Sequence, residues 1–144
     1  MIVVADTSGI IAASDRNADE SAACRSVLED AGTVIISPLV LTEVDHLAKE
    51  RFGSAARSAI IGVILEQAAV ERFLIPATGP EILQPARGVQ RHYSGLDLDL
   101  ADAVNVVLAA RYATRDLLTL DERDFRAIRP LTSHRWFRLL PHGQ

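Results

Sequence analysis

Five short apolar runs, most of them rich in β-branched residues, alternate along the chain with segments of helical periodicity. The apolar runs occupy residues 2–5, 33–36, 70–75, 116–120 and 136–140. Helical spacing of apolar residues is found in residues 18–30, 38–53, 54–69, 79–93 and 98–113. A strand with few polar positions is buried on both faces, which is typical of a parallel sheet with helices on each side. The alternation therefore predicts an α/β chain, with a three-layer α/β/α domain and a parallel sheet of about five strands.

We expect one domain over residues 1–144, because no linker, repeat or low-complexity segment interrupts this pattern. Apolar residues make up 49% and charged residues 24%. A folded chain of this size buries roughly 68–70% of its unfolded surface, so its core needs no metal or disulfide. The single cysteine, Cys24, cannot form an internal disulfide, which suits a cytoplasmic protein. The longest uncharged stretch, residues 31–42, is shorter than the ~18 residues that cross a bilayer, so we expect no membrane segment.

Four acidic residues stand beside small or apolar neighbours, where a carboxylate contributes little to folding. They are Asp6, Glu43, Asp102 and Asp121. Asp6 and Asp121 each follow a predicted strand, at the edge of the sheet where α/β domains bind ligands. Carboxylates that lie close together raise one another's pKa values, and a hard divalent cation removes that conflict. Oxygen ligands favour Mg²⁺ or Mn²⁺ over zinc, so the pattern indicates a metal site that can activate a water.

Each acid also has a purely structural interpretation. The alternatives are a turn or helix cap at Asp6, a solvated helix position at Glu43, a capping pair at Asp99 and Asp102, and turn acids at Asp121 and Asp124. A metal-free ribonuclease that uses two histidines is a further alternative, although nothing in the sequence pairs the four histidines. No glycine-rich phosphate loop follows the first strand, which excludes a dinucleotide site and a P-loop.

The distribution of charge permits a nucleic-acid partner. The net charge is −4, but residues 111–144 contain seven arginines and four acidic residues. Guanidinium groups suit phosphates, although a GC-rich genome would give the same preference for arginine and several of these side chains could pair with local acids. The candidates for RNA binding are Arg111, Arg115, Arg123 and Arg126.

With these residues identified, the chain resembles PIN-domain ribonucleases, and more particularly the VapC-type toxins of bacterial toxin–antitoxin pairs. The matching segments are Val-Val-Ala-Asp6-Thr-Ser, Ser-Pro-Leu-Val-Leu-Thr-Glu43-Val, Leu-Ala-Asp102-Ala-Val-Asn-Val-Val-Leu-Ala and Leu-Leu-Thr-Leu-Asp121-Glu-Arg-Asp124-Phe. Any one of them is a weak signal, but together they follow the order and spacing of the family over nearly the whole chain. Residues 79–95 are the least characteristic part.

The resemblance implies a metal-dependent endoribonuclease with a defined acidic site. By that resemblance, the catalytic ligands of Mg²⁺ or Mn²⁺ are Asp6, Glu43, Asp102 and Asp121, with Asp6 and Asp102 as the principal direct ligands. The supporting side chains would be Thr7, Ser8 and Thr119, and the residues that either join the site or cap a helix are Asp99 and Asp124. The implied reaction is in-line attack of an activated water on an RNA phosphodiester, which leaves a 5′-phosphate and a 3′-hydroxyl.

The resemblance also implies partners. Similar toxins form homodimers, are silenced by a small antitoxin whose tail covers the acidic groove, and cut transfer RNA or ribosomal RNA. The main alternative is a catalytically silent PIN-fold module that binds RNA or protein. Another is a PIN nuclease of RNA processing that belongs to no toxin–antitoxin pair.

Overall fold

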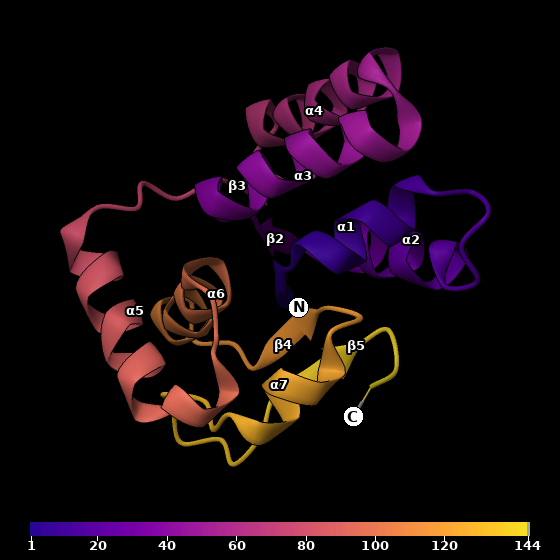
Figure 1. Cartoon of the computed structure of the whole chain (residues 1–144). Helices are drawn as coiled ribbons and strands as arrows, with labels where there is room; N and C mark the ends of the chain where they lie inside the picture. Colours follow the sequence, from indigo (N-terminus) through magenta and orange to yellow (C-terminus); the bar gives the residue numbers. More distant parts are fainter. Residues whose placement is uncertain (144) are drawn as a thin grey trace.

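A computed structural model describes residues 1–143 of the chain and contains one parallel sheet between layers of helices (Figure 1). Its strands are β1 (Ile2–Ala5), β2 (Thr33–Ile35), β3 (Phe73–Leu74), β4 (Asp116–Leu118) and β5 (Arg138–Leu140). Their order across the sheet is β3-β2-β1-β4-β5, and every neighbouring pair is parallel. The predicted α/β/α architecture and the parallel sheet of five strands are therefore confirmed. Gln144, the last residue of the predicted domain, lies outside the described residues.

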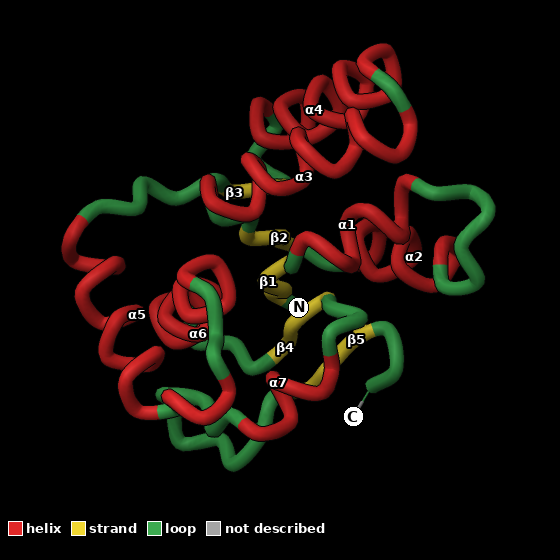
Figure 2. The backbone as a smooth tube through the Cα atoms, viewed as in Figure 1, coloured by secondary structure: helices red, strands yellow, loops and turns green. Residues whose placement is uncertain are grey.

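Seven α-helices and one 3-10 turn connect the strands within residues 1–143 (Figure 2). The helices are α1 (Thr7–Ser14), α2 (Ser21–Asp30), α3 (Pro38–Phe52), α4 (Ser54–Ala69), α5 (Pro80–His92), α6 (Leu100–Arg111) and α7 (Glu122–Ala127), and the 3-10 turn is η1 (Ser94–Leu96). The loop after β3 carries the chain from that edge strand to α5 (Figure 2).

Successive side chains of the buried strands point into two different cores, one on each face of the sheet. Val4, Ile35 and Leu117 belong to the core shared with α5 and α6, whereas Val3, Val34 and Leu118 belong to the core shared with α1 to α4. This alternation follows from the period of two residues in a strand. It explains why the strands have no polar face, and polar side chains such as Asp6 and Thr119 follow the carboxyl ends of the strands instead.

The structure corrects the sequence prediction at two helices and at several strand ends. We predicted a turn at residues 6–9 and no helix before residue 18, but α1 begins at Thr7. Its short sequence contains three hydroxyl residues and Gly9, which have weak helical preference, and packing against β4 determines its conformation. The short helix α7 was also missed. The third strand contains only Phe73 and Leu74, because the chain turns through Glu71 with φ of 62°.

Local signals explain where the site-bearing helices begin and end. Ser37 caps α3 by accepting a hydrogen bond from the backbone N–H of Leu39 at 3.1 Å, and Pro38 occupies the first helical position. Gly53, with φ of 92°, ends α3 and allows α4 to fold back beside it. In the described part of the chain, no helix combines the length and the apolar character that crossing a membrane would require.

Candidate active site

An acidic cleft of about 380 Å³ lies at the carboxyl ends of β1 and β4. Its walls come from α1, α3, the start of α6 and the loop after β4 (Figure 1). The acidic side chains that line it are Asp6, Asp15, Glu43, Asp99, Asp102 and Asp121. All four acids that the sequence singled out therefore lie in one cleft, although they are spread over more than a hundred residues of chain.

Asp6 is fixed at the base of the cleft by the end of β1. Its backbone N–H donates to the carbonyl of Leu118 at 2.9 Å, and its side chain is only 6% exposed. Asp6 occupies the N-cap position of α1, but its carboxylate does not cap that helix. Instead, Oδ2 accepts hydrogen bonds from Thr119 Oγ1 at 2.9 Å and from Ser8 Oγ at 3.3 Å. The Asp6 side chain therefore does not cap the helix, and its carboxylate is held by the two hydroxyl groups.

The hydroxyls of Ser8 and Thr119 also hold the loop that follows β4. Ser8 Oγ accepts a hydrogen bond from the backbone N–H of Leu120 at 2.9 Å. Thr119 Oγ1 accepts one from the backbone N–H of Asp121 at 3.0 Å, and the two hydroxyl oxygens are 3.2 Å apart. These bonds fix the position of Asp121 relative to Asp6. The two hydroxyl residues thus support the carboxylates, in the positions that the sequence suggested.

Glu43 approaches the cleft from α3, close to the first turn of α1. Thr7 Oγ1 donates to Glu43 Oε1 at 2.6 Å, and Thr7 is only 8% exposed. A charge-assisted hydrogen bond from a buried hydroxyl holds the carboxylate in one orientation. The half-buried Glu43 is therefore not the freely solvated helix residue of the alternative interpretation.

A second group of carboxylates comes from the first turn of α6, the loop after β4 and the start of α7. Ligand oxygens of Asp102, Asp121 and Asp124 are all within 4.8 Å of one another, which brings Asp124 into the site. Asp99 has a structural role as well, because its Oδ1 accepts a hydrogen bond from the backbone N–H of Asp102 at 2.8 Å and caps α6. The first turn of α6 also places the positive end of its helix dipole beside Asp102.

Burial and mutual repulsion raise the pKa values of the central carboxyl groups. Burial raises the pKa of Asp6 from 3.8 to about 6, and the charges of Glu43 and Asp121 add to that rise, while the hydrogen bond from Thr119 opposes it. Burial, followed by the charge of Asp6 and then that of Asp99, raises the pKa of Asp102 to about 8. Burial and the charge of Asp124 raise the pKa of Asp121 as well. These three carboxyl groups make no ion pair among the described residues, and an all-oxygen set of this kind suits Mg²⁺ or Mn²⁺.

Sequence reasoning missed three polar residues at this cleft: Asp15, which lines it at the end of α1, Arg51, and Asn105, which contacts Asp6. Asn105 is 1% exposed, and its Nδ2 donates to Asp6 Oδ1 at 3.4 Å. Its position three residues after Asp102, as the one polar residue between Ala103 and Ala109, was a signal available in the sequence. Arg51 also lines the cleft, at the end of α3. Nothing in the local sequence distinguishes it from other surface arginines.

The four arginines proposed for RNA binding do not lie together. Arg111 ends α6, so it is about 14 Å along the helix axis from Asp102, and Arg115 precedes the amino end of β4. Arg126 Nη2 contacts Glu122 Oε2 at 3.2 Å. Arg123 is exposed on α7, two residues after Asp121. Of the four, Arg123 is therefore the nearest in sequence and element to the cleft.

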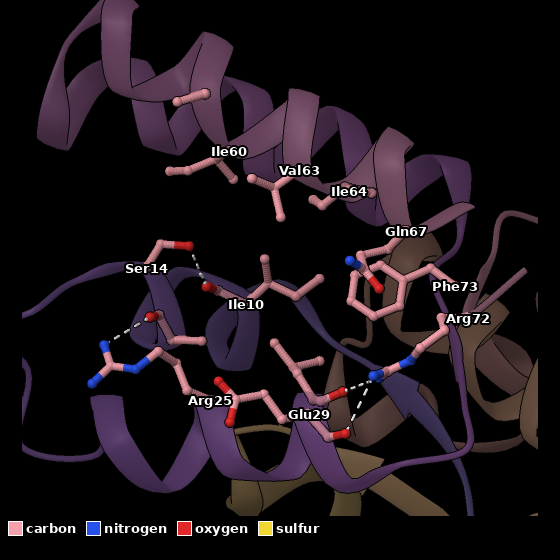
Figure 3. Close-up of a pocket in the computed structure, with 13 residues that line it drawn as sticks. Ile10, Ser14, Arg25, Glu29, Ile60, Val63, Ile64, Gln67, Arg72 and Phe73 are labelled. Carbon is pink, nitrogen blue, oxygen red and sulfur yellow. Dashed lines mark hydrogen bonds between the residues drawn. The ribbon is translucent and has the colours of Figure 1, made fainter. Parts of the chain in front are cut away.

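A separate apolar groove of about 460 Å³ lies between α1, α2 and α4 (Figure 3). Ile60, Val63 and Ile64 of α4 face Ile10 of α1 across it (Figure 3). Arg72 closes one end, where its Nη2 donates to the carbonyl of Leu28 at 2.6 Å and its Nη1 to the carbonyl of Glu29 at 3.3 Å (Figure 3). The groove contains no cluster of carboxylates, so its character suits the binding of apolar side chains.

Comparisons with known proteins agree with this arrangement. Residues 3–130 match the family model described as PIN domain. The chain is 38% identical to Ribonuclease VapC26 of Mycobacterium tuberculosis over 140 residues, which are 96% of this chain and 100% of that protein.

Two solved structures have the same fold. The crystal structure of Mycobacterium tuberculosis VapC20, a sarcin-ricin loop cleaving toxin, superposes with a TM-score of 0.73 at 16% identity, covering 83% of this chain and 89% of that one. A chain of VapBC2 from Rickettsia felis, bound to a DNA fragment from its promoter, gives a TM-score of 0.68 at 18% identity, covering 91% and 96%.

Proposed function

This chain belongs to the PIN-domain family, and from that premise we propose that it is a metal-dependent endoribonuclease that acts as the toxin of a toxin–antitoxin pair. The observation that carries the proposal is the cleft in which Asp6, Glu43, Asp102 and Asp121 meet. We further propose a cytoplasmic location, where its substrate would be structured RNA, either transfer RNA or ribosomal RNA. The ribonuclease relative supports the RNA substrate, and the cleft supports the chemistry.

The residues of the cleft fit Mg²⁺ or Mn²⁺ as the cofactor. The oxygens of Asp102, Asp121 and Asp124 are close enough to bind one ion together, and the raised pKa values of Asp102 and Asp121 support a site where a cation would stabilise the charged form. Asp6 and Glu43 complete the acidic set from the other wall. A bound divalent ion would supply charge neutralisation at the phosphodiester and a more acidic water.

The chain's own residues then have separable tasks in hydrolysis. The hydrogen bonds from Thr119, Ser8 and Asn105 hold both oxygens of Asp6 in a fixed orientation, so that little reorganisation is needed when substrate binds. Thr7 does the same for Glu43.

Cleavage of total bacterial RNA by the purified protein tests this function. Discrete cuts with Mg²⁺ or Mn²⁺ that disappear with EDTA and with Asp6→Asn are expected. Asp45→Asn is the matched control, because Asp45 is exposed on α3 and contacts Arg57 Nε at 3.6 Å outside the cleft. Cleavage that persists in EDTA would support a metal-free mechanism. Binding of RNA without any cleavage would support the silent PIN-fold module instead.

We propose that the antitoxin binds through the apolar groove between α1, α2 and α4. The VapBC2 neighbour supports an antitoxin as partner, and Val63 is 54% exposed in a groove whose lining includes Ile10, Ile60 and Ile64. The expected partner segment is an apolar helix or strand. Val63→Glu should abolish binding of the product of an adjacent short gene, yet leave RNA cleavage unchanged.

If cleavage occurs but no adjacent gene product binds, the protein is an RNA-processing nuclease. Sedimentation of the purified chain tests the homodimer that we also propose.

A further inference from the structure

Helix α3 presents three residues in a row to the acidic cleft. Glu43, Leu47 and Arg51 are spaced four residues apart, so they share one side of the helix, and all three line the cleft. Glu43 lies in the carboxylate group, and Arg51 lies two turns farther on. Helix α3 therefore contributes both Glu43, a candidate metal ligand, and the positively charged Arg51 to the same wall of the cleft.

Arg51 differs from the other residues that line this cleft. It is the one basic side chain among them in residues 1–143, where the acidic residues number six. Within the same range, its side chain makes no ion pair, although carboxylates such as Asp15 line the cleft with it. The nearby Arg57 of α4, by contrast, contacts Asp45. An exposed arginine without an ion pair contributes little to folding, and its five donors remain available to a ligand.

An acidic cleft needs such a cation if its ligand is a polyanion. The carboxylates repel every phosphate of an RNA strand, and a metal ion can compensate only at the phosphates that it touches. A guanidinium group binds a phosphate through two parallel hydrogen bonds, which gives a fixed orientation as well as attraction. Arg51 is placed to supply this attraction away from the metal-binding carboxylates.

We propose that Arg51 is a positioning residue that binds an RNA phosphate about three nucleotides from the cleavage site, and not the phosphate that is cleaved. This inference rests on the proposed ribonuclease function. Eight residues of helix separate Glu43 from Arg51, which corresponds to about 12 Å along α3. A stacked strand advances about 3.4 Å per nucleotide, so the phosphate at Arg51 is about three nucleotides from the one at the carboxylates. Arg51 would thereby set the register of the strand in the cleft.

RNA binding by a catalytically inactive protein tests the proposal without relying on turnover. In an Asp6→Asn background with Mg²⁺, binding of bulk transfer RNA and of ribosomal RNA fragments is measured at several salt concentrations. Arg51→Gln should raise the Kd about tenfold, as expected for a lost charge-assisted hydrogen bond. It should also reduce the dependence of log Kd on log salt by about 0.7, the contribution of one contact to a single strand. Lys49→Gln, which removes the same charge from an exposed site on α3 outside the cleft lining, is the matched control.

A neutral methylphosphonate at single positions of an RNA oligonucleotide then locates the contacted phosphate. The oligonucleotide spans the mapped cleavage site, and we expect one substitution, about three nucleotides from that site, to weaken wild-type binding but not Arg51→Gln binding. In the active protein, Arg51→Gln should raise KM and leave kcat nearly unchanged. Arg51→Lys should restore salt sensitivity while leaving part of the affinity loss.

The outcomes separate this inference from the proposed function. If Arg51→Gln weakens RNA binding no more than Lys49→Gln does, or if the methylphosphonate effects are the same in both proteins at every position, Arg51 does not contact RNA. Absence of RNA binding by the Asp6→Asn protein would also overturn the proposal. Binding that depends on Arg51, in a protein whose native form cuts no RNA, would reject the nuclease and leave Arg51 as an RNA contact.

Discussion

The amide nitrogen of Asn105 lies 3.4 Å from Oδ1 of Asp6, although 99 residues separate them in the sequence. Asn105 is almost completely buried, and its Oδ1 has no hydrogen-bond partner among the described residues. A buried amide oxygen without a partner costs about 1–3 kcal/mol of folding free energy. The position of Asn105 therefore indicates a role in orienting Asp6 rather than in stabilising the fold.

Replacement of Asn105 by leucine should separate these two roles. Asn105→Leu removes the unpaired oxygen, so we expect the free energy of unfolding to stay the same or to rise slightly. It also removes a donor that orients Asp6, and the loss of such an outer contact lowers metal affinity about 10–100-fold. Titration calorimetry with Mn²⁺ and urea denaturation in EDTA measure the two quantities. A purely structural role would give the opposite result, with lower stability and unchanged Mn²⁺ affinity.

Without divalent metal, the protein should be less stable at pH 8 than at pH 5. The pKa of Asp6 is about 6 and that of Asp102 is about 8, against an ordinary 3.8, so the folded state binds more protons than the unfolded state between these limits. Stability is therefore greatest below about pH 4 as far as these two groups are concerned, and it falls as the pH rises through 6 and then 8. Between pH 5 and pH 8, the expected loss from the buried Asp6 is about 1–2 kcal/mol.

Urea denaturation in EDTA at pH 5, 6.5 and 8 measures this loss. Saturating Mg²⁺ or Mn²⁺ should reduce it, because a bound cation favours the ionised carboxylates. Stability in EDTA that increases steadily between pH 5 and 8 would contradict the assignment of raised pKa values to these carboxyl groups.

Asp6→Asn should abolish cleavage and leave the fold intact, with greater stability than the native chain at pH 8 in EDTA. The substitution removes a buried charge and its repulsion by Glu43 and Asp121. The asparagine oxygen can still accept from Thr119, and a rotated Asn105 amide can use its unpaired oxygen to accept from the new amide group. Thermal unfolding of both proteins in EDTA at pH 8 measures the effect. An unfolded Asp6→Asn protein would show that Asp6 is needed for folding.

The central strands and the main acids of the site could be predicted from the sequence. Val3, Val4 and Val34 belong to apolar β-branched runs whose burial on both faces leaves few alternatives to a parallel strand. The carboxyl end of such a strand is the usual ligand-binding edge, which is why Asp6 and Asp121 could be assigned together. The positions of Asp6 and Asp121 directly after predicted strands are enough for this assignment, and no knowledge of side-chain packing is needed.

The rest depended on packing that local sequence does not encode. Asp124 lies within metal-binding distance of Asp102 only because α7 begins directly after the loop that Ser8 and Thr119 hold. Arg51 faces the cleft because α3 continues for two turns past Glu43 before Gly53 ends it. The spacing of residues along the sequence shows which of them share one face of a helix. It does not show which part of the protein that face contacts.

Gly9 shows how the packing of α1 against β4 supports the site. A Cβ atom added at Gly9 would lie 2.5 Å from Cγ of Leu118 and 3.0 Å from its carbonyl oxygen, so the helix can pack this closely only with glycine there. Gly9→Ala should therefore destabilise the protein by about 1–3 kcal/mol. The shift of α1 away from β4 should lengthen the hydrogen bonds of Ser8 with Asp6 and Leu120, and so lower Mn²⁺ affinity as well.

Gly62→Ala is the matched control for this substitution. Gly62 lies within α4, and a Cβ atom there would meet nothing within 4 Å. Alanine is a better helix former than glycine, so this change should stabilise the protein by roughly 0.5–1 kcal/mol. Urea denaturation and Mn²⁺ titration of both variants provide the comparison. If Gly9→Ala were as stable as Gly62→Ala and bound Mn²⁺ normally, α1 would tolerate displacement from β4, and the close contact at Leu118 would not be what holds Ser8 and Asp6 in place.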